Sequence, residues 1–383
     1  MNYGEVDIQD PRTQIPASAR VMFDEWMRDP HVCAAPDGSY YLTGTTREPG
    51  SPDGKAGMWS DGIRVWRSLD LKTWEPLGLV WSLDRDGTWQ RFFQVPEGDR
   101  IRFVEPAAFR AALPGPDVAV RRSLWAPEIH WVRRLKTFVL VASMNYGMGM
   151  PYDREKSPYL FGGIFALRST TGRAEGPYVA TSPGPLCDII DPCLFEQDDG
   201  RLYLLGLNNH LMELRSDLSG LVNPPPLREA EVGPGWLVKY ASLWDVPKLP
   251  QQTFTPEMRC EGGYLFKHNG RYHLCQSACP RLPRAGQPAA YAWEGMFTAN
   301  DRGPYDAVVA SAANVRGPYG PRYTALTHGG HGNFFRDHAG QWWACVFNPP
   351  SPAGGPYCPL PECRPALVPM RWDGDQILPE AKA

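Results

Sequence analysis

The chain has 383 residues, a length that suits two or three ordinary domains or one large all-β domain. Its 39 Lys and Arg against 42 Asp and Glu give a net charge of -3, which excludes the basic footprint of a protein that binds nucleic acid or an anionic membrane. No apolar run approaches the roughly 20 residues that a membrane-spanning helix needs.

The N-terminus and the cysteines bear on the cellular compartment. The first residues have neither the basic start nor the apolar core of a signal peptide. The 9 cysteines lack the spacing of a zinc site. Cys275 with Cys279, and Cys358 with Cys363, are spaced for disulfides, but we expect reduced, buried thiols. We therefore expect a cytoplasmic protein, or a periplasmic or secreted one if a signal peptide has been removed.

Secondary structure is expected to be almost entirely β. The chain contains 38 Gly and 40 Pro and no long segment with the 3.6-residue period of an amphipathic helix. One short helix is expected, around residues 105–113. Many short strands with frequent turns predict a sandwich, a barrel or a propeller.

The first predicted element is a hairpin in residues 27–46, MRDPHVCAAPDGSYYLTGTT. Asp37-Gly38 supplies its turn, and an aromatic strand follows. Pro30 has no N–H to donate to a sheet, so Asp29 is expected at the start of a strand. Taken alone, its carboxylate is either a local cap or a catalytic group.

The hairpin recurs along the chain, and each copy is followed by a strand with a polar outer turn. Further hairpins are predicted at residues 126–143, 191–206, 261–277 and 331–347. The segments after the hairpins are residues 63–74, 162–178, 210–220, 292–305 and 366–372. Each unit thus supplies about four strands, which is a propeller blade. The sequence therefore predicts an all-β, five-bladed β-propeller that forms a single domain over residues 1–383, with blades from about residues 29, 126, 191, 261 and 331.

Acidic residues occupy the starts of several predicted blades. The innermost strand of a propeller blade begins near the central axis, so Asp29, Asp191, Glu261 and His331 should converge there with residues 126–128. A cap explains one carboxylate but not a ring of them, because clustered like charges repel and raise one another's pKa values. The cluster therefore favours a catalytic role for Asp29.

These residues carry a resemblance to glycoside hydrolase family 43, whose members are five-bladed propellers that cleave furanosides and xylosides by inversion. The match runs from about residue 29 to residue 372. Two departures are Glu128, where the family has Asp, and Gly263, where many members have Pro. The matching motifs, in order, are Asp29-Pro30, DGIRVWRSLDLKTW, LWAPEIHW, IDPCLF, CEGGYLF and GGHGNFF.

The resemblance implies a role for each of five residues. Asp29 is similar to the family's general base, and Glu261 to its general acid. Asp191 is similar to the third carboxylate, which orients the acid and keeps its pKa high, with a local cap as the alternative. Trp59 resembles a sugar-stacking platform, or else packs within a blade. His331 resembles the histidine that helps to hold a hydrated cation, usually calcium, on the axis, with hydrogen bonding to buried water as the alternative.

Other polar residues near the site have plainer interpretations. Glu128 and His130 are expected to serve local structure. Cys33, Cys193 and Cys260 are expected to be small fillers between inner strands.

The substrate implied is an oligosaccharide or polysaccharide of plant or algal origin, with terminal arabinofuranose, xylose or galactose. The long connections at residues 82–122, 144–159 and 233–256 would wall the site into a pocket if they rise on its face, which favours exo action. No nucleic acid or membrane partner and no cofactor for the chemistry are expected, and the oligomeric state is open. Two alternatives remain: a retaining fructosidase-like propeller, which EWMRDP faintly resembles, and a carbohydrate-binding propeller without catalysis.

Overall fold

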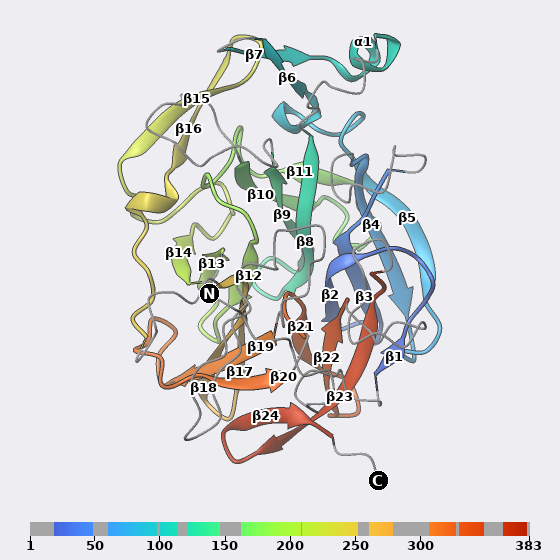
Figure 1. The fold of residues 1–383 in the computed structure, drawn as a ribbon, viewed down its shortest axis with the longest axis vertical. Helices are drawn as coiled ribbons and strands as arrows, with labels where there is room; N and C mark the ends of the chain where they lie inside the picture. The colour runs from blue at the N-terminus through green and yellow to red at the C-terminus, as the bar shows by residue number, and fades with distance from the viewer. Residues whose placement is uncertain are drawn as a thin grey trace, which may run out of the picture.

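In the computed structural model, small antiparallel sheets are arranged around a central axis (Figure 1). This arrangement is a five-bladed β-propeller, which confirms the predicted fold. No helix in the described stretches has the length and apolarity to cross a membrane. The structure describes residues 19–48, 60–97, 100–112, 122–145, 162–207, 209–251, 260–278, 306–326, 329–347 and 363–380.

Each blade is an antiparallel sheet. Its strands are arranged in sequence order, with the first strand nearest the axis and later strands farther out. The first three blades contain β2 (Arg28–Ala34), β3 (Tyr40–Thr45), β4 (Gly62–Ser68) and β5 (Glu75–Ser82); β8 (Ser123–Val132), β9 (Thr137–Asn145), β10 (Gly162–Ser169) and β11 (Tyr178–Ala180); and β12 (Cys193–Glu196), β13 (Leu202–Gly206) and β14 (His210–Leu214). The last two contain β17 (Cys260–His268), β18 (Arg271–Ala278), β19 (Asp306–Ala312) and β20 (Tyr323–Leu326); and β21 (Asn333–Arg336), β22 (Trp342–Val346), β23 (Ala366–Asp373) and β24 (Gln376–Pro379).

Blade strands are apolar on both faces because every blade packs between two others. In β9, Phe138, Leu140 and Ala142 belong to the core between blades 1 and 2, whereas Val139 and Val141 belong to the core between blades 2 and 3. Similar clusters fill the three remaining boundaries. The continuous apolar runs of the sequence are therefore strands that are buried on both faces.

Two sets of contacts close the ring between blades 5 and 1. The N-terminal strand β1 (Arg20–Val21) pairs antiparallel with β23, so blade 5 contains strands from both ends of the described chain. Nearer the axis, the Asn333 side-chain amide donates to the Val32 carbonyl at 2.9 Å and accepts from the Val32 N–H at 3.0 Å. Both contacts join distant parts of the sequence: Asn333 and Val32 are 301 positions apart, and β1 and β23 lie near opposite ends of the described chain.

Two insertions lie outside the blades. Between blades 1 and 2 the chain forms η2 (Trp89–Arg91), the β6–β7 hairpin and helix α1, which confirms the helix predicted at residues 105–113. The second insertion is a hairpin that packs against the first through the Gly233–Phe92 contact. Figure 1 shows both insertions at the rim of the propeller, so these described parts of the long connections do not cover the axis. The bounds are β6 (Phe93–Glu97), β7 (Arg100–Val104), α1 (Pro106–Ala111), β15 (Leu227–Gly233), β16 (Trp236–Ala241) and η3 (Leu243–Asp245).

The second half of blade 4 does not lie where the sequence analysis placed it. Residues 292–305 lie outside the described residues, and the third strand of the blade is β19, which starts at Asp306. Arg-Gly-Pro-Tyr occurs twice here, and its second copy, ending at Tyr319, is the outer turn. The Tyr319 hydroxyl donates to the Val315 carbonyl at 2.9 Å, just as Tyr178 in blade 2 donates to the Ala174 carbonyl at 2.9 Å. The prediction used the wrong copy of the motif.

The inner hairpin turns follow the sequence closely, including the one without glycine. Gly38, Gly200, Gly270 and Gly340 have φ angles of 85, 82, 75 and 95°, and Lys136 takes the same place in blade 2 with φ 50°. A side chain in this left-handed region costs roughly 1–2 kcal/mol, because its Cβ crowds the backbone.

We expect Lys136→Gly to raise the free energy of unfolding by about 0.5–1 kcal/mol, because glycine adopts this turn without strain. The reciprocal change Gly38→Lys is a matched control, since no atom of the described residues lies within 4 Å of a Cβ at Gly38, so backbone strain would dominate there. Urea unfolding of both variants measures the two effects. Equal destabilisation by both changes would contradict this account of the turns.

Candidate active site

The inner strand of every blade is preceded or interrupted by one residue in the left-handed backbone region. These residues, called the axial row below, are each followed by Pro or Gly. In blades 1, 2 and 4 the strand pairing shifts register at this point, which is a β-bulge. Bulges redirect side chains and occur often beside active sites. The axial row is Asp29, Ala126, Asp191, Gly262 and His331, with φ angles of 50, 44, 55, 56 and 55°.

His331 lies between two carboxylates of the axial row. Its Nδ1 is 3.1 Å from Asp29 Oδ1, and its Nε2 is 3.8 Å from Asp191 Oδ1. Asp191 Oδ2 accepts a hydrogen bond from the Gly262 N–H at 3.2 Å. All four residues line one cavity on the axis. The predicted convergence of Asp29, Asp191 and His331 is therefore present.

Glu261 enters this cluster from a position next to the axial row. The axial residue of blade 4 is Gly262, and a Cβ there would lie 2.5 Å from Cγ of His331, so a side chain has no room. Glu261 precedes it and is half-buried at the start of β17. Its negative charge acts on both Asp191 and His331. The four predicted residues thus form one electrostatic group, while Trp59 lies outside the described residues.

The cluster perturbs the protonation of its own members. Burial, followed by the negative charges of Glu261 and Asp29, raises the pKa of Asp191 to about 7, although His331 opposes the shift. Burial lowers the pKa of His331, but the charges of Asp29, Asp191 and Glu261 outweigh it and raise this pKa above its ordinary value. The site therefore holds a carboxyl that keeps its proton near neutral pH beside an imidazole that favours its cationic form.

Thr45 fixes the orientation of Asp29. Its hydroxyl donates to Asp29 Oδ2 at 2.7 Å and accepts from the Ala126 N–H at 2.8 Å, so the carboxylate is tied to the backbone of blade 2. Thr45 is the last residue of β3 and is buried. Thr45 was not predicted from the sequence, because its signal is its place opposite the bulge in β2, which only the strand pairing reveals.

We expect Thr45→Val to lower kcat about tenfold with a smaller change in KM, because the variant loses a charge-assisted hydrogen bond and leaves two buried polar groups unpaired. Thr45→Ser keeps the hydroxyl and should restore most of the activity. Steady-state kinetics on a common substrate give the comparison. If Ser were as poor as Val, packing of the threonine methyl group, rather than positioning of Asp29, would explain the loss.

A second row of side chains lines the channel two residues after the axial row. Glu128 accepts from the Leu194 N–H at 3.2 Å and contacts His130 at 2.7 Å, so it joins blade 2 to blade 3 as well as serving local structure. The Cys193 thiol accepts from a blade 4 N–H, so it does more than fill space. Burial, followed by the charge of His130, holds the pKa of His31 well below its ordinary range. The second row is His31, Glu128, Cys193, Tyr264 and Asn333.

The sequence of the chain matches the model of glycosyl hydrolases family 43 over residues 110–378. The chain belongs to this family. A protein of Escherichia coli (strain K12) named "Putative beta-xylosidase" is 25% identical over 353 residues, which cover 87% of this chain and 51% of that protein. The family 43 chain therefore spans about half the length of this curated relative.

Solved structures of two other family 43 proteins and of an arabinanase share the fold. BlXynB from Bacillus licheniformis superposes with a TM-score of 0.57 at 18% identity, over 94% of this chain and 56% of that one. An exo-1,5-alpha-L-arabinanase from a bovine ruminal metagenomic library gives 0.55 at 17%, over 96% and 99%. A GH43_1 enzyme from Xanthomonas citri, complexed with xylotriose, gives 0.57 at 17%, over 96% and 94%.

The fit of a calcium ion at His331 can be judged from the donors around the ring. Both ring nitrogens face carboxylates, at 3.1 Å from Asp29 and 3.8 Å from Asp191. Calcium prefers six to eight oxygen ligands, so an imidazole already directed at two carboxylates does not favour direct coordination. Axial calcium stays a prediction, and metal analysis of the purified protein tests it.

Proposed function

We propose that this family 43 chain is an inverting glycoside hydrolase that releases terminal pentose residues, xylose or arabinofuranose, from oligosaccharides. The observation that carries the proposal is the cluster of Asp29, Asp191 and Glu261 around His331 at the axis. The names of the relatives, a xylosidase and an exo-arabinanase, favour pentosides over galactosides. They also favour exo action.

Asp29 is the general base in this proposal. The Thr45 hydroxyl holds its Oδ2, and its Oδ1 lies 3.1 Å from His331 Nδ1 at the lining of the cavity. In an inverting reaction the base removes a proton from a water molecule, which attacks the anomeric carbon from the face opposite the leaving group.

Glu261 is the general acid, which protonates the departing glycosidic oxygen. Inversion needs room for water between base and acid, whose carboxyl groups lie roughly 6.5–9.5 Å apart in such enzymes. Glu261 comes one position before Gly262, the axial residue of its blade, whereas Asp29 is itself an axial residue. This difference in position supports separate roles for the two carboxyl groups. Asp191 is the third carboxylate, and it takes part in holding the proton that the group retains near neutral pH.

A panel of aryl glycosides and short oligosaccharides tests the proposal. We expect turnover of xylosides or arabinofuranosides with release of single sugars, and NMR should show that the first product has the inverted anomeric configuration. A retained configuration would favour the fructosidase-like alternative. Binding without turnover across the panel would favour a carbohydrate-binding propeller.

A further inference from the structure

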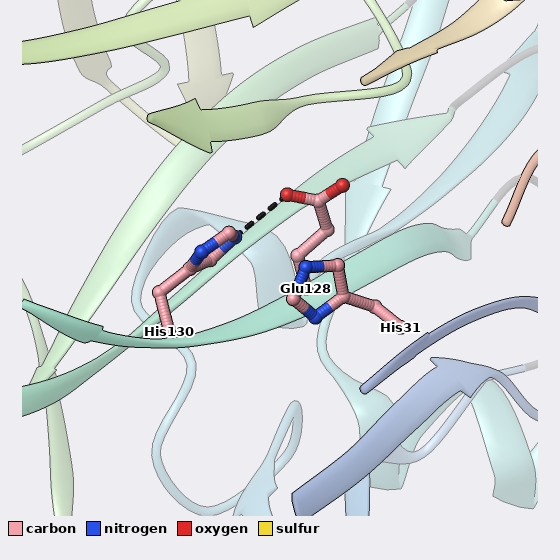
Figure 2. A group of neighbouring side chains, drawn as sticks. All are labelled: His31, Glu128 and His130. Carbon is pink, nitrogen blue, oxygen red and sulfur yellow. Dashed lines mark hydrogen bonds and ion pairs between the residues drawn. The ribbon is translucent and has the colours of Figure 1, made fainter. Parts of the chain in front are cut away.

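A group of side chains below the axial row is not used by the proposed reaction. His31 comes from β2 in blade 1, and Glu128 and His130 come from one face of β8 in blade 2. Their nearest ligand atoms all lie within 4.8 Å of one another. Figure 2 shows the His130 ring and the Glu128 carboxylate beside each other on one strand, with the His31 ring close to Glu128.

His31 is the member whose state calls for a ligand. The residue is 4% exposed, and both of its ring nitrogens are buried without a hydrogen-bond partner among the described residues. A buried polar atom that lacks a partner costs about 1–3 kcal/mol. The ring lies 4.5 Å from that of His130, centroid to centroid, and His31 and Glu128 both line the axial cavity. An ion in this position would give His31 the partner that the described residues do not supply.

The donor set identifies the class of ion. Two imidazoles and one carboxylate form a ligand set typical of zinc, whereas calcium and magnesium prefer oxygen ligands. Zinc bonds of about 2.0–2.1 Å place ligand atoms about 3.3 Å apart in a tetrahedral site, so small side-chain rotations would complete this one. Water can occupy the fourth position from the cavity.

We propose that His31, Glu128 and His130 bind one divalent transition-metal ion of the zinc class, which links blades 1 and 2 inside the channel. The ion ties β2 to β8 two residues beyond Asp29 and Ala126, where Thr45 already makes one link between these blades. Its role is structural: it stabilises the wall of the site that carries Asp29. The proposal is independent of the hydrolase activity.

The test uses the full chain, stripped with a chelator and dialysed. We expect about one equivalent of Zn²⁺ to bind and to raise the melting temperature by about 3 °C or more at saturation. Co²⁺ in place of Zn²⁺ should give the visible d–d absorption of a tetrahedral nitrogen and oxygen site. Stoichiometric binding, the thermal shift and the Co²⁺ spectrum together would support the site.

Variants locate the ion. His31→Gln and His130→Gln should each abolish the thermal shift and the Co²⁺ spectrum, whereas exposed His338→Gln and axial His331→Gln should keep both. The wild-type protein alone can overturn the proposal, whether or not the variants fold, if it binds no stoichiometric Zn²⁺ or Co²⁺. Retention of both signals in His31→Gln would overturn it as well.

Discussion

Replacing Asp29 with Asn is expected to lower kcat by about 10²–10⁴-fold on an unactivated glycoside, and Glu261→Gln by a similar factor, because each change removes a group that transfers a proton in the transition state. The fold should survive both changes. Asn is among the residues that tolerate the left-handed backbone found at Asp29, where φ is 50°. Its amide oxygen can also still accept from the Thr45 hydroxyl.

The nature of the leaving group separates the two roles. A substrate whose leaving group departs without protonation should restore much of the activity of Glu261→Gln but little of that of Asp29→Asn, because only the acid acts on the leaving oxygen. Asp198→Asn is a suitable control, since that side chain is 70% exposed and pairs with Lys267 at the surface. Equal rescue of both active-site variants would void the assignment, and near-wild-type turnover by either would remove that residue from the mechanism.

Much of this site could be predicted because its geometry follows from local sequence signals. Asp-Gly and Asn-Gly turns locate three of the inner hairpins, and a residue before Pro or Gly marks the left-handed position at which each inner strand meets the axis. Fivefold repetition then places Asp29, Asp191 and His331 together without any knowledge of their contacts. Family resemblance adds the roles but not the reason for the left-handed backbone.

The residues that were missed depend on pairing between distant strands. Thr45 reaches Asp29 only because the bulge in β2 shifts the register against β3. His31 meets His130 only because β2 and β8 are neighbours at the axis, although the residues lie in different blades. The misplaced half of blade 4 has the same origin, since two identical Arg-Gly-Pro-Tyr segments are distinguished only by which strand pairs with β18.

Asp191 connects the electrostatics of the cluster to its pH dependence. Its pKa is raised from an ordinary value of 3.8 to about 7, first by burial and then by Glu261 and Asp29. Between these two pH values the folded protein binds more protons than the unfolded chain, so the free energy of unfolding falls as pH rises through this window. The proton is shared within a coupled group, and its apparent pKa belongs to the group.

Asp191→Asn is therefore expected to move the alkaline limb of the pH–kcat/KM profile to lower pH and to reduce activity at pH 7 at least tenfold. With one negative charge removed, the coupled group releases its shared proton more readily, so its protonated form is lost at a lower pH. The same change should make the protein more stable than the wild type above pH 7. It removes a buried carboxyl whose ionised form the fold disfavours. Kinetic profiles and melting curves across pH measure the two effects on one pair of proteins. If the alkaline limb stays in place while activity falls, Asp191 is a substrate-binding residue. If the variant is less stable than the wild type above pH 7, the attraction of the Asp191 carboxylate to His331 outweighs the cost of burying that carboxylate.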